Sequence, residues 1–260
     1  MNRYGQVITW GTASAPQLCT GICTGYNYND QVTRQLDEDE AGDNRAIILH
    51  SAKAAISFSA KITADSTNFL DLSSGAAITV SGISTGLVLV SRAVETWRLS
   101  QPKTAQITAT HYPAMTQTGT AAAPTNLNAF TPTQTGLGLI TPGGSLIYGT
   151  AGLTHTAGVL HELEITQQLT IAEDEPDPSG SLLGAASHGY LRAIRARILA
   201  KATAPVKGST LSITGAPDHA ADYLVESVNT VFTDKRGKMY EIGAVWIPPL
   251  SSGNDGGGQS

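Results

Sequence analysis

The stretch LVSRAVETW, from Leu89 to Trp97, is rich in β-branched and aromatic residues, which is typical of a β-strand. It returns 135 residues later as LVESVNTVF, from Leu224 to Phe232. A strand-like segment that recurs in this way indicates a β-fold that is present twice. The rest of the chain has the same two properties, strand character and recurrence.

Five further matches keep their order along the chain, with separations of 133 to 138 residues. They are ITWGTA with LIYGTA (Trp10 with Tyr148), Gly21-Ile22 with Gly158-Val159, Glu38-Asp39-Glu40 with Glu173-Asp174-Glu175, SGAAITVSG with KGSTLSITG, and KTAQITATHYP with KMYEIGAVWIP. The matches predict two tandem copies of one domain, residues 1–115 and 146–250. Residues 116–145, rich in Thr, Pro and Gly, are predicted to be a linker, and residues 251–260 a flexible tail.

Strand signals fill both copies, so we expect an all-β fold in which each copy is a small β-sandwich or barrel. Alternation with a period of two places Ile22, Thr24, Tyr26 and Tyr28 on one face of a strand, and Ile56, Phe58, Ala60 and Ile62 on one face of another. The best helix candidate is YLRAIRARILAKA at 190–202, but its counterpart SAKAAISFSAKIT alternates like a strand. We therefore expect a strand there as well, with a short helix in each copy as the alternative.

Composition limits the class of protein. Hydrophobic residues make up 41% of the 260-residue chain and charged residues only 14%, a charge-poor surface that a protein buried in an assembly tolerates. No apolar run reaches the roughly 18 residues of a membrane helix, and the N-terminus lacks the apolar core of a signal peptide, so we expect neither a membrane segment nor export. Cys19 and Cys23 alone predict neither a disulfide scaffold nor a zinc site.

The charge balance argues against tight binding of nucleic acid. The chain has 16 Lys and Arg residues against 21 Asp and Glu residues, a net charge of −5, rather than the basic face that holds a phosphate backbone. One small basic cluster comprises Arg192, Arg195, Arg197 and Lys201. We expect this cluster either to pair with acids of a neighbouring molecule or to be a solvated face.

Motifs that resemble catalytic ones are better explained as turns and strands. GISTG (Gly82–Gly86) has the pattern of a nucleophile elbow around Ser84, but a strand-like segment follows where the elbow needs a helix. Ser100 and Lys103 lie at another predicted turn. The six histidines are scattered, and a metal shared by His155 and His161 is the less favoured alternative to ordinary packing. We expect no enzyme, no cofactor and no metal.

Acidic residues are concentrated in two segments, QLDEDEAGDNR (Gln35–Arg45) and IAEDEPDPSG (Ile171–Gly180). The residues concerned are Asp37, Glu38, Asp39, Glu40, Asp43, Glu173, Asp174, Glu175 and Asp177. A cation site, a solvated loop, and a surface that makes or repels contacts in an assembly are the three interpretations.

With two β-domains, an extended linker and a repeated acidic segment, the chain resembles bacteriophage tail tube proteins, in particular those whose tube domain is duplicated in one chain. The residues that carry the resemblance are YGQVITWGTA and LIYGTA, the acidic segments QVTRQLDEDEAGDNR and QQLTIAEDEPDPSG, and the strand pair SRAVETWRLSQPKTAQITATHYPAM. The resemblance covers both copies and most of the chain. It extends to the tube proteins of type VI secretion, which share that domain.

The resemblance implies a β-domain that forms rings, here of three chains with pseudo-sixfold symmetry, which stack into a tube that conducts DNA into the host. The implied partners are further copies of the chain, the tape measure, a baseplate or sheath and a terminator, with passive contact with DNA in the lumen. The implied location is the virion, after assembly in the host cytoplasm. In such a tube we expect the acidic residues named above at the ring-stacking surface or in the lumen, with a solvated outer loop or a cation site as alternatives.

Two other interpretations stay open. The chain can instead form a baseplate, tube-initiator or tail-terminator ring with the same fold. A carbohydrate-binding β-sandwich is the alternative from another class, and it needs exposed aromatic platforms. We do not expect such platforms, because Trp10 and Trp97 match Tyr148 and Phe232, and matched aromatic residues indicate a core.

Overall fold

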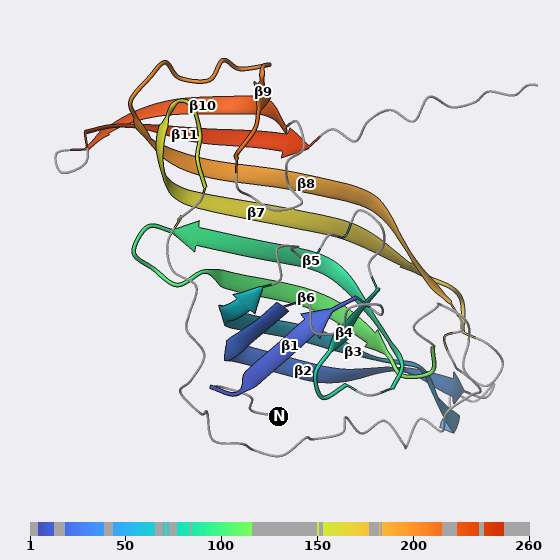
Figure 1. Ribbon diagram of the computed structural model, residues 1–260. Coiled ribbons are helices and arrows are strands. Elements are labelled where there is room, and N and C mark those ends of the chain that lie inside the picture. Colours follow the sequence, from blue (N-terminus) through green and yellow to red (C-terminus); the bar gives the residue numbers. More distant parts are fainter. Residues whose placement is uncertain are drawn as a thin grey trace, which may run out of the picture.

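The computed structural model describes residues 5–12, 19–38, 44–65, 70, 72, 77–83, 85–115, 150, 153–176, 182, 184–214, 223–233 and 237–246. In these ranges the chain is all-β and contains no α-helix, and Leu72 alone has a 3₁₀ conformation (Figure 1). The all-β prediction is confirmed, and the alternative of a short helix in each copy finds no support in these ranges. The described residues accordingly offer no helix of the length and hydropathy needed to cross a membrane.

Eleven strands of the described ranges form one sheet. They are β1 (Val7–Gly11), β2 (Cys19–Glu38), β3 (Asn44–Asp65), β4 (Ala77–Val80), β5 (Leu87–Arg98), β6 (Thr104–Tyr112), β7 (Gly158–Glu173), β8 (Ala185–Ala200), β9 (Thr210–Leu211), β10 (Tyr223–Thr233) and β11 (Gly237–Trp246). Their order in space is β4-β1-β2-β3-β6-β5-β7-β8-β11-β10-β9. Because β4 also pairs with β5, the first six strands close into a barrel, and the other five extend the sheet beyond β5 (Figure 1).

The barrel interior is filled by side chains that alternate inward along its strands. Ile56, Phe58, Ala60 and Ile62 are all buried, which confirms the face predicted for this strand. Trp10 packs edge-on against Phe58, with 5.4 Å between the ring centroids. The segment at 190–202 lies largely in β8, a strand as expected, and its inward residues belong to a second core between β7, β8, β10 and β11.

The second half of the sheet repeats the first. The order β7-β8-β11-β10-β9 corresponds to β2-β3-β6-β5-β4, and the residue pairings correspond as well. β7 follows β2 by 137 residues, as in Leu160 and Cys23, and β8 follows β3 by 138, as in Ile194 and Ile56. β10 and β11 follow β5 and β6 by 135, as in Val225 and Val90 and in Ala244 and Ala109. β9 follows β4 by 133, as in Leu211 and Ile78. These separations agree with the sequence matches at Gly21, at SGAAITVSG, at LVSRAVETW and at KTAQITATHYP.

Irregularities of the strand pairing recur at corresponding positions. Register shifts lie between Cys23 and Gly25 in β2, Leu160 and Glu162 in β7, Val90 and Arg92 in β5, and Val225 and Ser227 in β10. In β5 the shift lies where the strand changes partner, since Leu89 pairs with β4 whereas Arg92 pairs with β7. An extra residue bends and twists a strand, so this bulge directs β5 out of the barrel and into the extended sheet.

The same irregularity corrects one predicted face of β2. Cys23, and not Ile22, is buried in the barrel core, whereas Tyr26 and Tyr28 pack against that core. The bulge after Cys23 inserts one residue and reverses the alternation, so Ile22 and Tyr26 do not share a face. The predicted linker 116–145, the LIYG residues of the LIYGTA match and the predicted tail 251–260 lie outside the described residues, and the domain boundaries stay a prediction.

Candidate assembly interface

The two halves of the chain are joined by one strand pairing. β5 pairs with β7 in an antiparallel register that runs from Arg92 opposite Gln168 to Arg98 opposite Glu162. The backbone N–H of Leu99 extends the ladder by donating to the carbonyl oxygen of His161, at 2.8 Å. This pairing makes the sheet continuous from the barrel to β10, and we call it the β5–β7 junction.

Trp97 is the central apolar side chain of the β5–β7 junction. It lies on β5 but belongs to the core of the second half, opposite the fully buried Leu163, and is only 7% exposed. The Lys103 ammonium lies 4.2 Å from the centroid of its ring and 3.4 Å from a carboxylate oxygen of Glu95. The indole therefore covers a buried cation and its counter-ion, in addition to filling the core.

A buried amide also crosses the β5–β7 junction. Gln167 of β7 donates from Nε2 to the carbonyl oxygen of Leu70, at 2.6 Å, and its Oε1 accepts from the backbone N–H of Leu72, at 2.9 Å. The Tyr190 hydroxyl donates to the same Oε1, at 2.9 Å, and accepts from Nε of Arg192. The Leu70 carbonyl and the Leu72 N–H, which precede β4, thus have their hydrogen-bond partner in the second half of the chain, and this fixes the two halves relative to each other.

A third contact joins the long hairpin arms of the two halves. The Lys53 ammonium of β3 lies 2.6 Å from Glu173 Oε2 at the end of β7, and the Tyr112 hydroxyl donates to Glu173 Oε1, at 2.7 Å. Partial burial raises the pKa of the Glu173 carboxyl, but the bonds and charge of Lys53 and the bond from Tyr112 outweigh it, so that the pKa lies below its ordinary value of 4.5.

Replacing Glu173 with Gln is expected to cost about 0.5–1 kcal/mol of the free energy of unfolding at pH 7, because Lys53 loses its charged partner in a contact that solvent partly screens. A carboxyl whose folded-state pKa is lowered stabilises the fold above its unfolded-state pKa, and this contribution is lost as the pH falls through the folded-state pKa. The wild type and Glu173→Gln are therefore expected to differ at pH 7 and to converge below pH 4.5. Urea unfolding at both pH values measures this. Glu175→Gln, at an exposed position, is the control, and an undiminished difference at low pH would contradict the contact.

A buried pair holds the strand β2 in place. The Nε2 atom of His111 lies 2.7 Å from the carbonyl oxygen of Thr85, which only accepts, so Nε2 carries a proton. Burial lowers the pKa of His111, against the opposing effect of the bond to Thr85, which leaves Nδ1 free of a proton at neutral pH. That atom accepts from the Tyr28 hydroxyl, at 2.9 Å, and thereby fixes the middle of β2 against β6.

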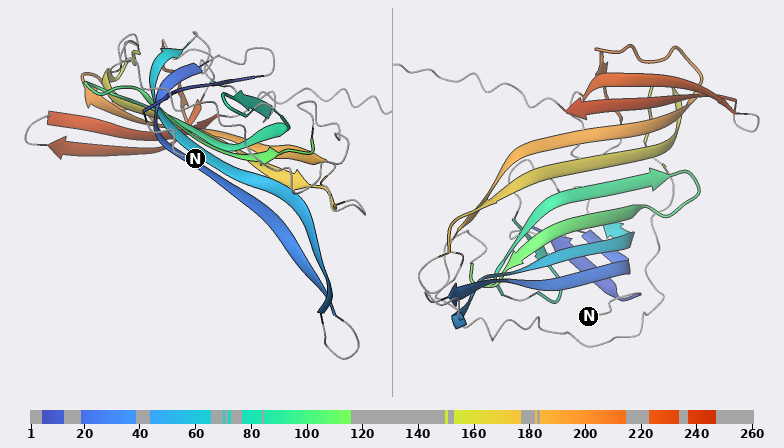
Figure 2. Two further views of the ribbon diagram at one scale, coloured as in Figure 1. Left: turned by 90° about the horizontal axis from the view of Figure 1, so that it is seen from below. Right: turned by 180° about the vertical axis from the view of Figure 1, so that it is seen from behind.

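Each end of the sheet leaves a strand edge without a described partner strand. β9 pairs with β10 only at Tyr223 and Leu224, so no described strand pairs with the outer edge of 227–233. β1 pairs with β2 only over Cys19–Ile22, so no described strand pairs with the outer edge of 25–31. The two edges lie at opposite ends of the sheet (Figures 1 and 2). Phe232, which corresponds to Trp97 at the separation of 135, is 75% exposed.

The acidic segments lie at the tips of the two long hairpins, β2–β3 and β7–β8. Because β2 and β7 run in the same direction through the antiparallel sheet, both tips lie at the same end of it (Figure 2). Asp37 and Glu38 end β2, Glu173 ends β7, Asp174 and Glu175 are exposed, and Asp39, Glu40, Asp43 and Asp177 lie outside the described residues. Among the described residues, the structure therefore places Asp37 and Glu38 at the end of β2, and Glu173, Asp174 and Glu175 at or just after the end of β7.

The predicted alignment of the two acidic segments is wrong by two residues. The pairing of β2 and β7 keeps a separation of 137 to the end of β7, so Glu173 corresponds to Leu36 and not to Glu38. Runs of Glu and Asp match one another at several offsets, and only the strand register distinguishes them. Glu173 is also distinct in its contacts, since Lys53 and Tyr112 hold it.

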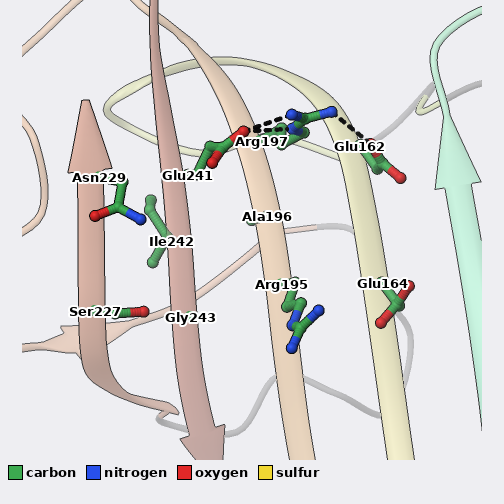
Figure 3. Close-up of a pocket in the computed structure, with 10 residues that line it drawn as sticks. All are labelled: Glu162, Glu164, Arg195, Ala196, Arg197, Ser227, Asn229, Glu241, Ile242 and Gly243. Atoms are coloured by element: carbon green, nitrogen blue, oxygen red, sulfur yellow. Dashed lines mark hydrogen bonds and ion pairs between the residues drawn. The ribbon is translucent and has the colours of Figure 1, made fainter. Parts of the chain in front are cut away.

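One face of the second half carries a row of alternating charges across four strands. Arg98 Nε lies 2.7 Å from Glu162. Arg197 contacts both Glu162, at 3.6 Å, and Glu241, at 2.5 Å (Figure 3). The hydrogen bonds and charge of Glu241, with a further contribution from Glu162, raise the pKa of Arg197. The row borders a shallow cavity of about 450 Å³ that also contains Glu164 and Arg195. In the first half the positions corresponding to Glu162, Arg197 and Glu241 are Gly25, Ser59 and Gln106, which carry no charge.

The predicted basic cluster does not act as one group. Arg197 pairs with acids of its own chain, and Arg195 points from the same face into the cavity (Figure 3). Arg192 lies on the opposite face and is buried, 5.2 Å from the Trp246 ring. Successive residues of a strand point to opposite faces, which separates Arg192 from the other two.

The structure also places the remaining residues that the sequence analysis considered as catalytic or metal-binding candidates. The GISTG segment connects β4 to β5, so a strand follows where a nucleophile elbow needs a helix, and Ser84 lies outside the described residues. Lys103 is buried against Trp97 and next to Glu95, whereas Ser100 is exposed. Cys19 and Cys23 are both buried, and the described residues contain no group of three or more His, Cys, Asp or Glu side chains able to hold a metal.

Comparison of the sequence with models of known protein families and with curated proteins gives no match.

Proposed function

We propose that this chain is a structural protein of a bacteriophage tail tube, in which three copies close into a ring with pseudo-sixfold symmetry. Rings then stack into a channel that conducts DNA. The observation that carries this proposal is the β5–β7 junction. Two corresponding halves already share one continuous sheet through the pairing of β5 with β7. Toward its two ends, this sheet presents the outer edges of β10 and β2, which are the counterparts of β5 and β7.

The geometry of such an assembly follows from the type of contact. The β5 edge of one half meets the β7 edge of the other, so the contact joins two different surfaces. Contacts of this kind generate a closed ring when the rotation between units closes, and an open filament when it does not. Closure also removes exposed strand edges, which otherwise pair with other chains and aggregate. A ring of three chains contains six junctions, three within chains and three between them.

Two charge properties support the conduction of DNA. A basic channel wall would hold a phosphate backbone through the release of counter-ions, whereas this chain has a net charge of −5. The exposed row of Arg98, Glu162, Arg197 and Glu241 pairs each cation with an acid. A wall of this kind lets a polyanion pass without retaining it.

The hairpin tips are the proposed ring-stacking surface, since both acidic groups lie at one end of the sheet. The triple variant Glu38→Lys, Asp174→Lys and Glu175→Lys is expected to form rings of unchanged mass but shorter tubes, because reversing the charge of the tips changes the electrostatic match at the contact. Tube lengths measured by negative-stain electron microscopy test this. The matched control, Lys61→Glu and Lys207→Glu, changes charge away from the tips, and an unchanged length distribution in the triple variant would contradict the stacking surface.

The first experiment is to measure the mass of the purified chain and to image it. Rings of three chains with apparent sixfold symmetry are the expected result, and long tubes would favour the tube protein. Assembly that stops at a single ring would favour the tube-initiator or terminator role. A monomer at every concentration reached would contradict ring formation. The buried positions of Trp10 and Trp97 favour a core role over a carbohydrate platform.

A further inference from the structure

The correspondence between the two halves specifies how a second copy of the chain would meet the first. Inside the chain, β5 pairs with β7. β10 corresponds to β5, and β2 corresponds to β7, at the separations of 135 and 137 established by the strand pairings. Transferring the register of the β5–β7 junction places Ser227 opposite Gln31, Asn229 opposite Asn29, and Phe232 opposite Tyr26 of the neighbouring chain.

The exposure of Phe232 agrees with the transferred register. Its counterpart Trp97 is 7% exposed because Leu163 and the second core cover it. Phe232 is 75% exposed, and the residue that corresponds to Leu163 is Tyr26, on the other edge of the sheet. An aromatic side chain placed on a strand edge is thus matched by an aromatic side chain on the edge expected to meet it.

Two further exposed apolar residues occupy the positions that correspond to the two partners of an ion pair within the chain. Lys53 and Glu173 join the hairpin arms of the two halves. The residue corresponding to Lys53 is Leu191, at the separation of 138, and the residue corresponding to Glu173 is Leu36, at the separation of 137. Leu191 is 46% exposed and Leu36 is 37% exposed. The contact that is an ion pair within the chain would therefore be an apolar pair between chains.

We propose that a second copy of this chain docks its β2 edge on the β10 edge in this register, with Leu191 of one chain packed against Leu36 of the next. The proposal rests on the proposed ring and names its chain-to-chain contact. The three junctions within chains are then held by an ion pair at the hairpin arms, and the three between chains by apolar side chains. A mismatched junction would leave Lys53 or Glu173 against a leucine, which disfavours incorrect pairing.

The register is tested by cross-linking. Directly opposite residues of an antiparallel pair have Cα atoms about 4.5–5.5 Å apart, within reach of a disulfide. A chain with Asn29→Cys and Asn229→Cys is expected to give covalent multimers up to three chains on mild oxidation. The control, Thr33→Cys with Asn229→Cys, is four residues out of register and is expected to give none. The native thiols of Cys19 and Cys23 are buried.

The apolar pair is tested by exchanging it for the ion pair found within the chain. Leu191→Lys alone and Leu36→Glu alone are each expected to weaken ring formation at least about tenfold, because each places a charge against a leucine. The double variant, Leu36→Glu with Leu191→Lys, is expected to return to within about threefold of the wild type and to become sensitive to salt. The assembly constant is measured by sedimentation at low and high salt.

The outcomes separate the two proposals. Rings that form without the disulfide between positions 29 and 229 would overturn the register and leave the ring standing. Cross-linking in the expected register without rescue in the double variant would overturn the Leu191–Leu36 contact. A wild-type chain that forms no rings would overturn the proposed function, and with it this contact.

Discussion

Replacing Trp97 with Ala is expected to lower the free energy of unfolding by about 3–5 kcal/mol, the range for a large aromatic residue removed from a core. The indole is 7% exposed and packs in the second core although it belongs to a barrel strand. Its loss also uncovers Lys103, whose ammonium lies 4.2 Å from the ring centroid. The variant therefore weakens the barrel and the second half together, rather than either alone.

Urea unfolding of a monomeric background measures this effect, because self-association would otherwise add to the apparent stability. The Phe232→Asp background described below supplies such a monomer. Trp97→Phe is the matched control, since it keeps an aromatic ring against Leu163 and corresponds to the residue present in the second half. It is expected to cost clearly less than Trp97→Ala. A loss below about 1 kcal/mol in Trp97→Ala would show that the β5–β7 junction does not depend on this side chain.

Replacing Phe232 with Asp is expected to abolish ring formation, with a loss of affinity of at least about a hundredfold. The side chain is 75% exposed in the single chain, so its replacement costs the fold little. In the ring it would be buried against Tyr26 of the next chain, where an unpaired carboxylate is strongly unfavourable. The expected result is a folded monomer, and mass measurement together with the urea midpoint distinguishes it from an unfolded chain.

The control for this variant is Val159→Asp, which puts the same group on a partly exposed apolar residue of β7, in the middle of the sheet. It is expected to leave assembly unchanged. If Phe232→Asp formed rings as strongly as the wild type does, the β10 edge would be excluded from the interface. Loss of assembly in both variants to the same degree would point to a general effect of charge rather than to the edge.

Much of the fold could be predicted from local sequence patterns. Alternation over Ile56–Ile62 predicts the inward face of β3, and the two related stretches at Leu89 and Leu224 fall on the corresponding strands β5 and β10. The face of β2 could not be predicted, because one bulge residue reverses the alternation and leaves no mark in the composition. The alignment of the acidic tips failed for a related reason, since an acidic run is nearly unchanged by a shift of two.

The side chains of the candidate interface were harder to predict. Lys53 and Gln167 look like ordinary polar residues of a strand, yet each bonds to a segment about a hundred residues away in sequence. Only the pairing of β5 with β7 brings these segments together, and nothing local in the sequence specifies it. The one available signal was the recurrence of Trp97 as Phe232, which predicts a core residue at both positions; Trp97 is buried, but the prediction is wrong for Phe232, which is 75% exposed in the chain.

The row of charges across β5, β7, β8 and β11 determines how the electrostatic potential changes with distance from this face. Its signs alternate from strand to strand, so the row repeats about every 10 Å, twice the spacing of neighbouring strands. The potential of a periodic array with no net charge decays over a length shorter than its own repeat. If this face lines the proposed channel, a long polyanion held away by its hydration layer would therefore experience a nearly uniform electrostatic potential along it. Friction against the wall, rather than affinity for it, would then limit how fast such a molecule moves.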